Sequence, residues 1–97
     1  MPVFKGGQDR LITYLSTFLR YPDDAIKDSV QGIVLVEFKI STTGKVTNAR
    51  VLTSLSPSCD KEAVRVVSSM PDWIPGKSEG NPVNVIMKIP IVFRFKL

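Results

Sequence analysis

The closing stretch of the chain constrains the fold most strongly. Hydrophobic side chains occupy every second position from Val83 to Leu97. This two-residue period predicts a long strand with one buried face. Pro90 lies near the middle of the strand, and proline has no N–H to donate to a neighbouring strand. Because proline inside sheets is confined to edge strands and bulges, we expect this strand to form an edge of the sheet.

Two interpretations of this edge stay open when only the residues are considered. The cationic side chains of the strand and Pro90 are features that keep other strands from pairing, so they favour a protected edge. Alternatively, the unpaired N–H and C=O groups bind an extended peptide, which adds to the sheet as a further strand. The residues by themselves favour the protected edge over peptide binding.

A second apolar stretch predicts the centre of the sheet. The segment Gly32–Ile40 is rich in β-branched residues and is apolar on both faces at its start, which is typical of a central strand. The segment Thr42–Lys45 predicts a hairpin turn that leads into a return strand from Val46 to about Thr53. The apolar residues of the return strand do not share one face, which predicts a bulge near Thr47 and Asn48.

Apolar residues at helical spacing predict two helices near the start of the chain. The first is capped by Gln8 or Asp9 and ends by about Tyr21, because the residue before a proline avoids helical geometry. The second begins at Pro22, carries acidic residues in its first turn and stops near Ser29. We expect Tyr21 to be structural and to pack at the junction between these two helices.

A third helix is predicted between the return strand and the last strand. Ser58 is placed to cap its first turn, and Pro71 ends it. One face is expected to be exposed to water and carries the charged residues Lys61, Glu62 and Arg65. The opposite face is expected to be buried and carries Cys59, Ala63, Val66, Val67 and Met70.

Together these elements predict an α+β fold. The hairpin pairs the first two strands antiparallel, and Pro90 places the third strand at an edge. The simplest arrangement is a three-stranded antiparallel sheet in the order second–first–third, with the helices packed on one face. A chain of 97 residues suffices for one hydrophobic core, so residues 1–97 are expected to form a single domain.

The segment Asp72–Pro82 is rich in proline and glycine and is expected to be a loop around the single tryptophan. Trp73 is expected to close one end of the core and to donate its indole N–H to a loop carbonyl. The other residues assigned a structural role are turn-forming glycines and a proline: Gly32, Gly44, Pro75, Gly76 and Gly80.

The residue inventory excludes several kinds of active site. The chain has no histidine and one cysteine, so it has no histidine-based triad, no histidine-ligated zinc site and no internal disulfide. Acidic pairs such as Asp23-Asp24 lie in the first turns of predicted helices, where the helix dipole explains them. We therefore expect no enzymatic activity, no metal and no cofactor. The net charge of +4 is spread along the chain, which argues against nucleic-acid binding.

Short motifs along the chain give a further indication. They follow one another from about Val3 to Phe95. They are Tyr21-Pro22, Gly44-Lys45-Val46, Asp60-Lys61-Glu62-Ala63, Met70-Pro71-Asp72-Trp73, Pro75-Gly76-Lys77 and Pro90-Ile91-Val92-Phe93. In this order and spacing the chain resembles the C-terminal domain of TonB-family energy transducers, in the variant typical of Bacteroidetes-type bacteria.

The resemblance implies a periplasmic domain at the end of a longer protein, whose N-terminal part holds an inner-membrane helix and joins proton-driven motor proteins. It also implies binding of the TonB box, an extended peptide of outer-membrane receptors, by strand addition to the last strand. Such binding passes proton-motive-force energy to active nutrient transport. The residues carried over as the peptide-binding edge are Val85, Ile86, Met87, Lys88, Ile89, Ile91, Val92 and Phe93. Further peptide contacts are expected at Arg20, Tyr21 and Pro22.

Other interpretations of the same domain stay open. TonB-like modules also terminate some membrane metallopeptidase receptors, where this chain would be an interaction or sensing module. The last strand could instead pair with a second copy, which would make the chain a structural homodimerisation domain. The scattered cationic side chains are a candidate contact with peptidoglycan, although a solvated surface explains them more simply.

Overall fold

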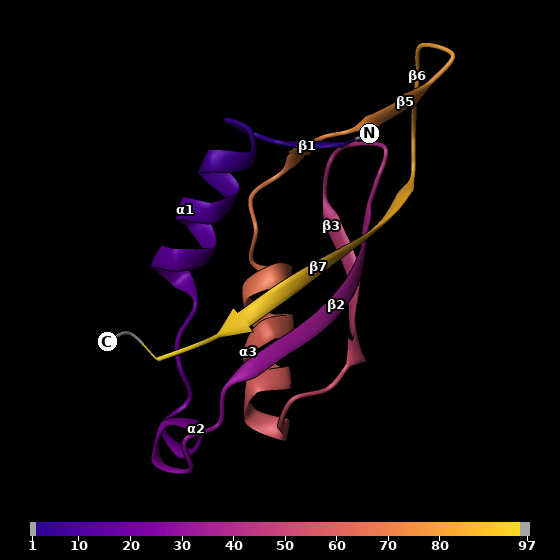
Figure 1. Ribbon diagram of the computed structural model, residues 1–97. Coiled ribbons are helices and arrows are strands. Elements are labelled where there is room, and N and C mark those ends of the chain that lie inside the picture. The colour runs from indigo at the N-terminus through magenta and orange to yellow at the C-terminus, as the bar shows by residue number, and fades with distance from the viewer. Residues whose placement is uncertain (1, 96–97) are drawn as a thin grey trace.

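A three-stranded sheet forms the centre of the structure, with helices against one of its faces (Figure 1). The computed structural model describes residues 2–95, so Lys96 and Leu97, which we predicted to continue the last strand, lie outside the described residues. In chain order the elements are β1 (Val3–Phe4), α1 (Gln8–Phe18), α2 (Asp23–Lys27), β2 (Gly32–Ile40), β3 (Val46–Thr53), α3 (Pro57–Ser68), β4 (Trp73–Ile74), β5 (Gly76–Ser78), β6 (Asn81–Val83) and β7 (Val85–Phe93). None of the helices within residues 2–95 combines the length and the hydropathy that a membrane span requires.

The sheet has the order β3-β2-β7, and its neighbouring strands are antiparallel. β2 and β7 pair without a break, from Gly32 opposite Phe93 to Ile40 opposite Val85. The inward side chains of β2 are buried almost completely, as a central strand requires: Val34, Val36, Phe38 and Ile40. The predicted fold class and strand order are therefore confirmed.

The ladder between β2 and β3 is interrupted, unlike the ladder between β2 and β7. Its register shifts twice, between Leu35 and Val36 and between Glu37 and Lys39. Asn48 lies at the second shift and has a φ of 55°, a left-handed backbone that accommodates an extra residue. The predicted bulge in the return strand is confirmed.

α3 covers the inner face of the sheet and supplies the opposite half of the core. The side chains buried there are the predicted ones: Cys59, Ala63, Val66, Val67 and, just past the helix, Met70. The cap differs from the prediction, because Ser56 rather than Ser58 precedes the helix. The Ser56 hydroxyl accepts the Cys59 N–H, and Pro57 takes the first helical position, where a missing N–H costs nothing.

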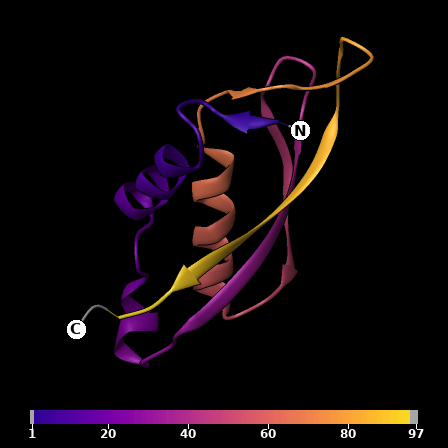
Figure 2. The same ribbon diagram turned by 45° about the horizontal axis from the view of Figure 1, so that its top comes forward.

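α1 lies beside α3, on the same side of the sheet (Figure 2). The Tyr14 hydroxyl donates to the Val66 carbonyl oxygen at 3.0 Å, which joins the two helices. The helix begins after Gly7 without a side-chain cap, so the predicted caps at Gln8 and Asp9 are wrong. Gly7 itself has a φ of 84°, and this turn brings the chain from β1 into the helix.

The segment Asp72–Pro82 is more regular than a loop. β4 pairs with β1, and β5 pairs with β6 in a short hairpin, so the loop prediction is wrong here. Asn84 separates β6 from β7, and the strand predicted to start at Val83 therefore starts at Val85. Strands of two or three residues are too short to show a period in the sequence.

Trp73 closes the end of the core next to the β2–β3 hairpin. Its backbone N–H donates to the Gly44 carbonyl oxygen at 2.7 Å. Gly44 has a φ of 86°, and a Cβ there would overlap the Trp73 carbonyl oxygen, so only glycine fits. The predicted indole hydrogen bond is wrong, because the Trp73 Nε1 has no partner among the described residues. Gly76 also differs from its prediction, since it lies inside β5 against Val85 rather than in a turn.

Candidate functional site

One long edge of the sheet is free. Within residues 2–95, β7 pairs with β2 on one side and with no strand on the other. Figure 1 shows α1, rather than a strand, across from the outer edge of the yellow β7. The last strand is thus an edge strand, as the position of Pro90 predicted.

The side chains of β7 divide between the two faces of the sheet. Those on the inner face are buried in the C-terminal part of the strand: Ile89, Ile91 and Phe93. Those on the outer face are exposed: Ile86, Lys88, Pro90 and Val92. The residues carried over as a binding edge are therefore not equivalent, because three of the eight are buried in the core.

The main-chain groups of β7 alternate as well. In an antiparallel pair, residues that exchange two hydrogen bonds alternate with residues whose N–H and C=O point away from the partner strand. Pro90 lies opposite Leu35 and has no N–H, so this pair is not a hydrogen-bonded one. The Pro90 carbonyl therefore points to the free edge, together with the main-chain groups of Ile86, Lys88 and Val92.

Because of this alternation, the predicted edge residues differ in the main-chain groups that they present at the free edge. Ile86, Lys88 and Val92 each present an N–H and a C=O at the free edge. Pro90, which is not among the predicted edge residues, presents a C=O there. The main chain of the other predicted residues is directed to β2: Val85, Met87, Ile89, Ile91 and Phe93.

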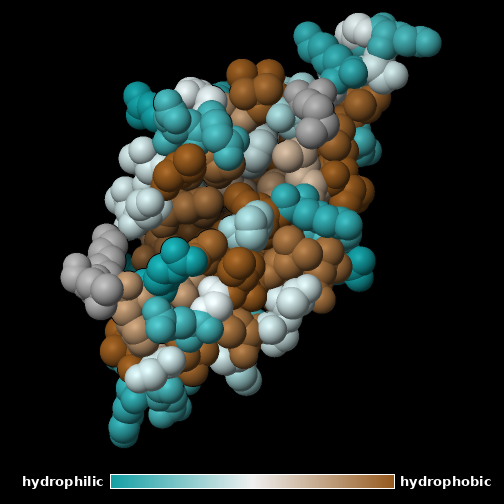
Figure 3. All heavy atoms as spheres, viewed as in Figure 1, coloured by the Kyte–Doolittle hydropathy of each residue, from teal (hydrophilic) through white to brown (hydrophobic). Residues whose placement is uncertain are grey.

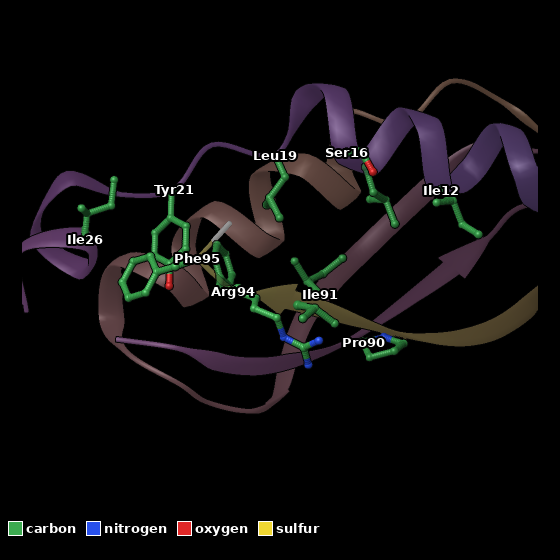
Figure 4. A pocket seen from close by; sticks show the side chains of 12 residues that line it. Ile12, Ser16, Leu19, Tyr21, Ile26, Pro90, Ile91, Arg94 and Phe95 are labelled. Carbon is green, nitrogen blue, oxygen red and sulfur yellow. The ribbon is translucent and has the colours of Figure 1, made fainter. Parts of the chain in front are cut away.

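A groove of about 560 Å³ runs beside this edge. α1, the segment after it and Ile26 of α2 form one wall, which we call the helical wall, and the C-terminal half of β7 forms the other (Figure 4). Figure 3 shows brown, apolar atoms in the recess between α1 and β7. The side chains of the helical wall are Ile12, Leu15, Ser16, Leu19 and Ile26.

The helical wall was not predicted from the sequence. Ile12 is 54% exposed although it belongs to the apolar side of α1. A signal was present, because the apolar residues of this helix cover a wider arc than packing against one neighbour requires. Those residues are Leu11, Ile12, Tyr14, Leu15, Phe18 and Leu19. The pattern does not say which of them face the core and which line a groove.

Of the three further contacts predicted after α1, the structure brings Tyr21 to the groove. Its ring stacks on Phe95, with ring centroids 5.0 Å apart, and its hydroxyl donates to the Val30 carbonyl oxygen. Arg20 and Pro22 do not line the groove. Tyr21 therefore packs at the junction of α1 and α2, as expected, and also forms one end of the groove.

The segment after α1 is attached to α3 by charged groups. The Glu62 carboxylate accepts the Arg20 N–H at 2.7 Å and pairs with Arg65 at 2.6 Å. The Glu62 side chain is 11% exposed, so the prediction that it faces water is wrong. Burial raises the pKa of Glu62, but the hydrogen bonds from Arg65 and from the Arg20 N–H outweigh it and hold the pKa below its ordinary value.

The site has the chemistry of a binding surface for an extended apolar segment. Arg94 is the charged residue among the described lining of the groove. Cys59, a residue of α3, is buried in the core. Main-chain donors and acceptors along a strand edge, beside an apolar wall, are the two parts that strand addition uses.

The chain is similar to known proteins over most of its length. A solution NMR structure of the Helicobacter pylori TonB C-terminal domain matches it with a TM-score of 0.66 and 29% identity, covering 88% of this chain and 89% of that chain. A longer fragment of the same protein matches with a TM-score of 0.66 and 27% identity, covering 88% of this chain and 77% of that chain. A comparison with curated protein sequences gives no match.

The family comparison agrees with the structural one. The family described as Gram-negative bacterial TonB protein C-terminal matches residues 18–95. This range includes β2, β7, α3 and the segment that forms the end of the groove. The chain belongs to the family of TonB C-terminal domains.

Proposed function

We propose that this chain is the periplasmic domain of a TonB energy transducer and binds the TonB box of outer-membrane receptors by strand addition to β7. The observation that carries the proposal is a regular, unpaired strand edge beside an apolar groove. Membership of the TonB C-terminal family supports it. In this role an N-terminal membrane helix tethers the domain to proton-driven motor proteins, and the domain passes their energy to nutrient transport without catalysing a reaction.

The guest peptide would bond the main chain at alternate residues of β7. Lys88 and Val92 each offer an N–H and a C=O, whereas Pro90 between them offers only a C=O. Each bond contributes only about 0.5–1.5 kcal/mol net, so the attachment is reversible. A force along the strands acts on all of these bonds at once, which suits a domain that transmits tension.

The side chains of the guest would meet different surroundings on the two faces. Residues of an added strand alternate between the faces of the sheet, so every second guest side chain lies toward α1. Ile12, Leu15 and Leu19 on that side favour apolar guest side chains. The remaining guest side chains lie on the outer face, where Lys88 favours an acidic residue beside it and the exposed Ile86 and Val92 favour apolar ones.

Titration with synthetic peptides from receptor N-termini tests the proposal. We expect the amide NMR signals of Lys88 and Val92, and those of the α1 residues that line the groove, to shift together and to saturate. A control peptide with the same composition in scrambled order should shift them much less. Changes confined to the β5–β6 hairpin, or no saturable change with any receptor peptide, would contradict the proposal.

The same edge supports a second candidate function, a homodimer in which β7 pairs with β7 of another copy. The edge presents both donors and acceptors, as antiparallel pairing of two identical strands requires. Sedimentation over a range of concentrations separates the two functions. A dimer that dissociates when receptor peptide is added would show competition for one edge, and a monomer at every concentration would exclude the homodimer.

A further inference from the structure

The segment between α1 and α2 forms part of the groove although it has no regular secondary structure. It runs from Leu19 to Pro22, and the side chains of Leu19 and Tyr21 line the groove. A segment without its own hydrogen-bonded structure keeps a fixed position only if other contacts hold it. Those contacts are made by the Tyr21 hydroxyl and by two charged residues of α3.

The two charged residues, Glu62 and Arg65, bind the main chain on both sides of Leu19. Arg65 Nη2 donates to the Phe18 carbonyl oxygen at 2.8 Å, and Glu62 Oε2 accepts the Arg20 N–H at 2.7 Å. Arg65 also donates to Glu62 through Nε at 2.6 Å and through Nη2 at 2.7 Å. We call these hydrogen bonds the clasp.

The clasp forms hydrogen bonds with main-chain groups at the C-terminal end of α1 that have no partner within the helix. The last carbonyl groups of a helix have no partner within the helix, and cationic side chains near the C-terminus can bond them. Hydrogen bonds that involve an ionised partner are stronger than those between neutral groups. Because the clasp fixes the residues on both sides of Leu19, it determines how far this side chain reaches toward β7. Figure 4 shows Leu19 and Ile91 on opposite walls of the groove.

We propose that Glu62 and Arg65 are positioning residues for guest binding, because they hold the wall of the groove at the distance from β7 that an added strand requires. The binding part of this inference rests on the proposed function, while the holding part concerns this chain alone. Neither residue lines the groove, so their effect passes through Leu19 and its neighbours rather than through contact with the guest.

The alternative is that the pair only stabilises α3. An ion pair three residues apart on a helix surface usually adds little to stability. The chain offers a matched control in Glu37 and Arg50, whose Oε1 and Nε lie 2.8 Å apart. This second pair joins β2 to β3, and neither of its residues lines the groove.

Three variants separate positioning from stabilisation. Glu62→Gln weakens the clasp, and Arg50→Gln weakens the control pair from the β3 side, away from β7. The double variant Glu62→Arg with Arg65→Glu reverses the charges and keeps an ion pair on α3. The reversed pair cannot form the two hydrogen bonds to the main chain of the segment. Position 65 then lacks a donor for the Phe18 carbonyl, and position 62 lacks an acceptor for the Arg20 N–H.

We expect Glu62→Gln and the reversed pair to weaken receptor-peptide binding about three- to tenfold, since each removes charge-assisted hydrogen bonds that hold the wall. Hydrogen exchange of the Arg20 amide should become faster in the same two variants. Arg50→Gln should leave both quantities unchanged, because Arg50 lies on β3, away from the β7 edge, although its unfolding midpoint should fall about as much as that of Glu62→Gln.

Two results would overturn the inference. The first is an unchanged peptide affinity in the reversed pair although its Arg20 amide exchanges faster. The segment after α1 would then have lost its hydrogen bonds to α3 without any effect on binding. The second is an unchanged Arg20 exchange rate in that variant. If the unmodified chain binds no receptor peptide, the proposed function fails by itself. The clasp is then judged by Arg20 exchange alone, and an unchanged exchange rate in the reversed pair overturns it.

Discussion

The sheet has two edge strands, β3 and β7, and they differ in how much of the outer edge another strand can use. Within residues 2–95 both pair with β2 alone. β7 follows β2 without interruption, whereas the ladder of β3 shifts register twice. A bulge bends the strand and leaves a residue unpaired, so β3 does not present an even row of donors and acceptors. The edge of β7 is regular, and its row of donors and acceptors lacks the N–H of Pro90.

Exposure alone therefore does not make an edge suitable for the proposed strand addition. The bulges protect β3 in the way that natural sheets protect their edges. β7 carries a protective residue as well, but Pro90 is oriented so that the ladder with β2 stays intact and the free edge loses a single donor. A regular ladder and the neighbouring apolar wall of α1 together distinguish the β7 edge from the β3 edge.

A proline at a β7 position whose N–H is directed to β2 should perturb the chain most. Ile89 lies opposite Val36 and is buried, and its N–H belongs to the ladder with β2. Ile89→Pro should lower the free energy of unfolding by about 3 kcal/mol or more, because it leaves a buried acceptor unpaired and removes apolar volume. Lys88→Pro should cost far less in denaturant unfolding while weakening peptide binding. Equal destabilisation by the two prolines would contradict the assignment of outward main-chain groups.

An acidic side chain introduced into the groove should have the next largest effect. Its effect on peptide binding is compared with that of an acidic side chain on the surface of β3. Ile12→Asp should weaken peptide binding by about 1.5 kcal/mol or more, roughly tenfold, because an apolar contact is replaced by a carboxylate that the guest would desolvate. Leu52→Asp is the matched control on β3, where the leucine is 38% exposed. Isothermal titration calorimetry should find the affinity of the control unchanged, and a similar loss in both variants would remove the distinction between the edges.

Replacing Pro90 restores the donor that the free edge of β7 lacks. Pro90→Ala adds an N–H that points to the free edge, so peptide binding should strengthen by about 0.5–1.5 kcal/mol. The variant should also associate with itself more readily, because an unprotected regular edge invites pairing. Peptide titration and sedimentation measure the two effects. Unchanged affinity in this variant would show that the guest does not bond the main chain at this position.

The smallest effect is a pH dependence that originates beside the groove. The pKa of Glu62 is held low in the folded chain by Arg65 and the Arg20 N–H, so its carboxylate stabilises the fold above the ordinary glutamate pKa of about 4.3. This stabilisation should be lost as the pH falls through the lower, folded value. Because Arg65 is partly solvated, we expect less than about 1 kcal/mol. Urea unfolding at pH 3 to 6 should show this dependence, and Glu62→Gln should flatten it.

The central sheet and α3 could be predicted because their side chains follow simple periods. Alternating apolar residues identify β2 and β7, and a helical period identifies the buried face of α3. The edge position of β7 could be predicted from Pro90 alone, since the missing N–H is a property of that one residue. The bulge at Asn48 could be predicted because the apolar residues around it cannot share one face of a regular strand.

The groove and the clasp could not be predicted, because they depend on distances between segments far apart in the sequence. Arg20 and Glu62 are 42 residues apart, and a glutamate on the polar face of a helix gives no sign of its partner. The pairing of β1 with β4 involves two residues in each strand, too few for a period. Ser56 and Ser58 are equally able to cap a helix. Ser56 is the cap because Pro57 favours the first helical position, directly after the capping residue.

The place of the only tryptophan has a practical consequence. Trp73 packs against Phe4 and Phe38 and bonds Gly44, toward one end of the sheet, whereas Tyr21 marks the groove near the other. Its fluorescence should therefore change when the chain unfolds and stay nearly constant when a peptide occupies the groove. The fluorescence of Trp73 thus reports whether a variant is folded, and loss of peptide binding can be distinguished from loss of structure in the same sample.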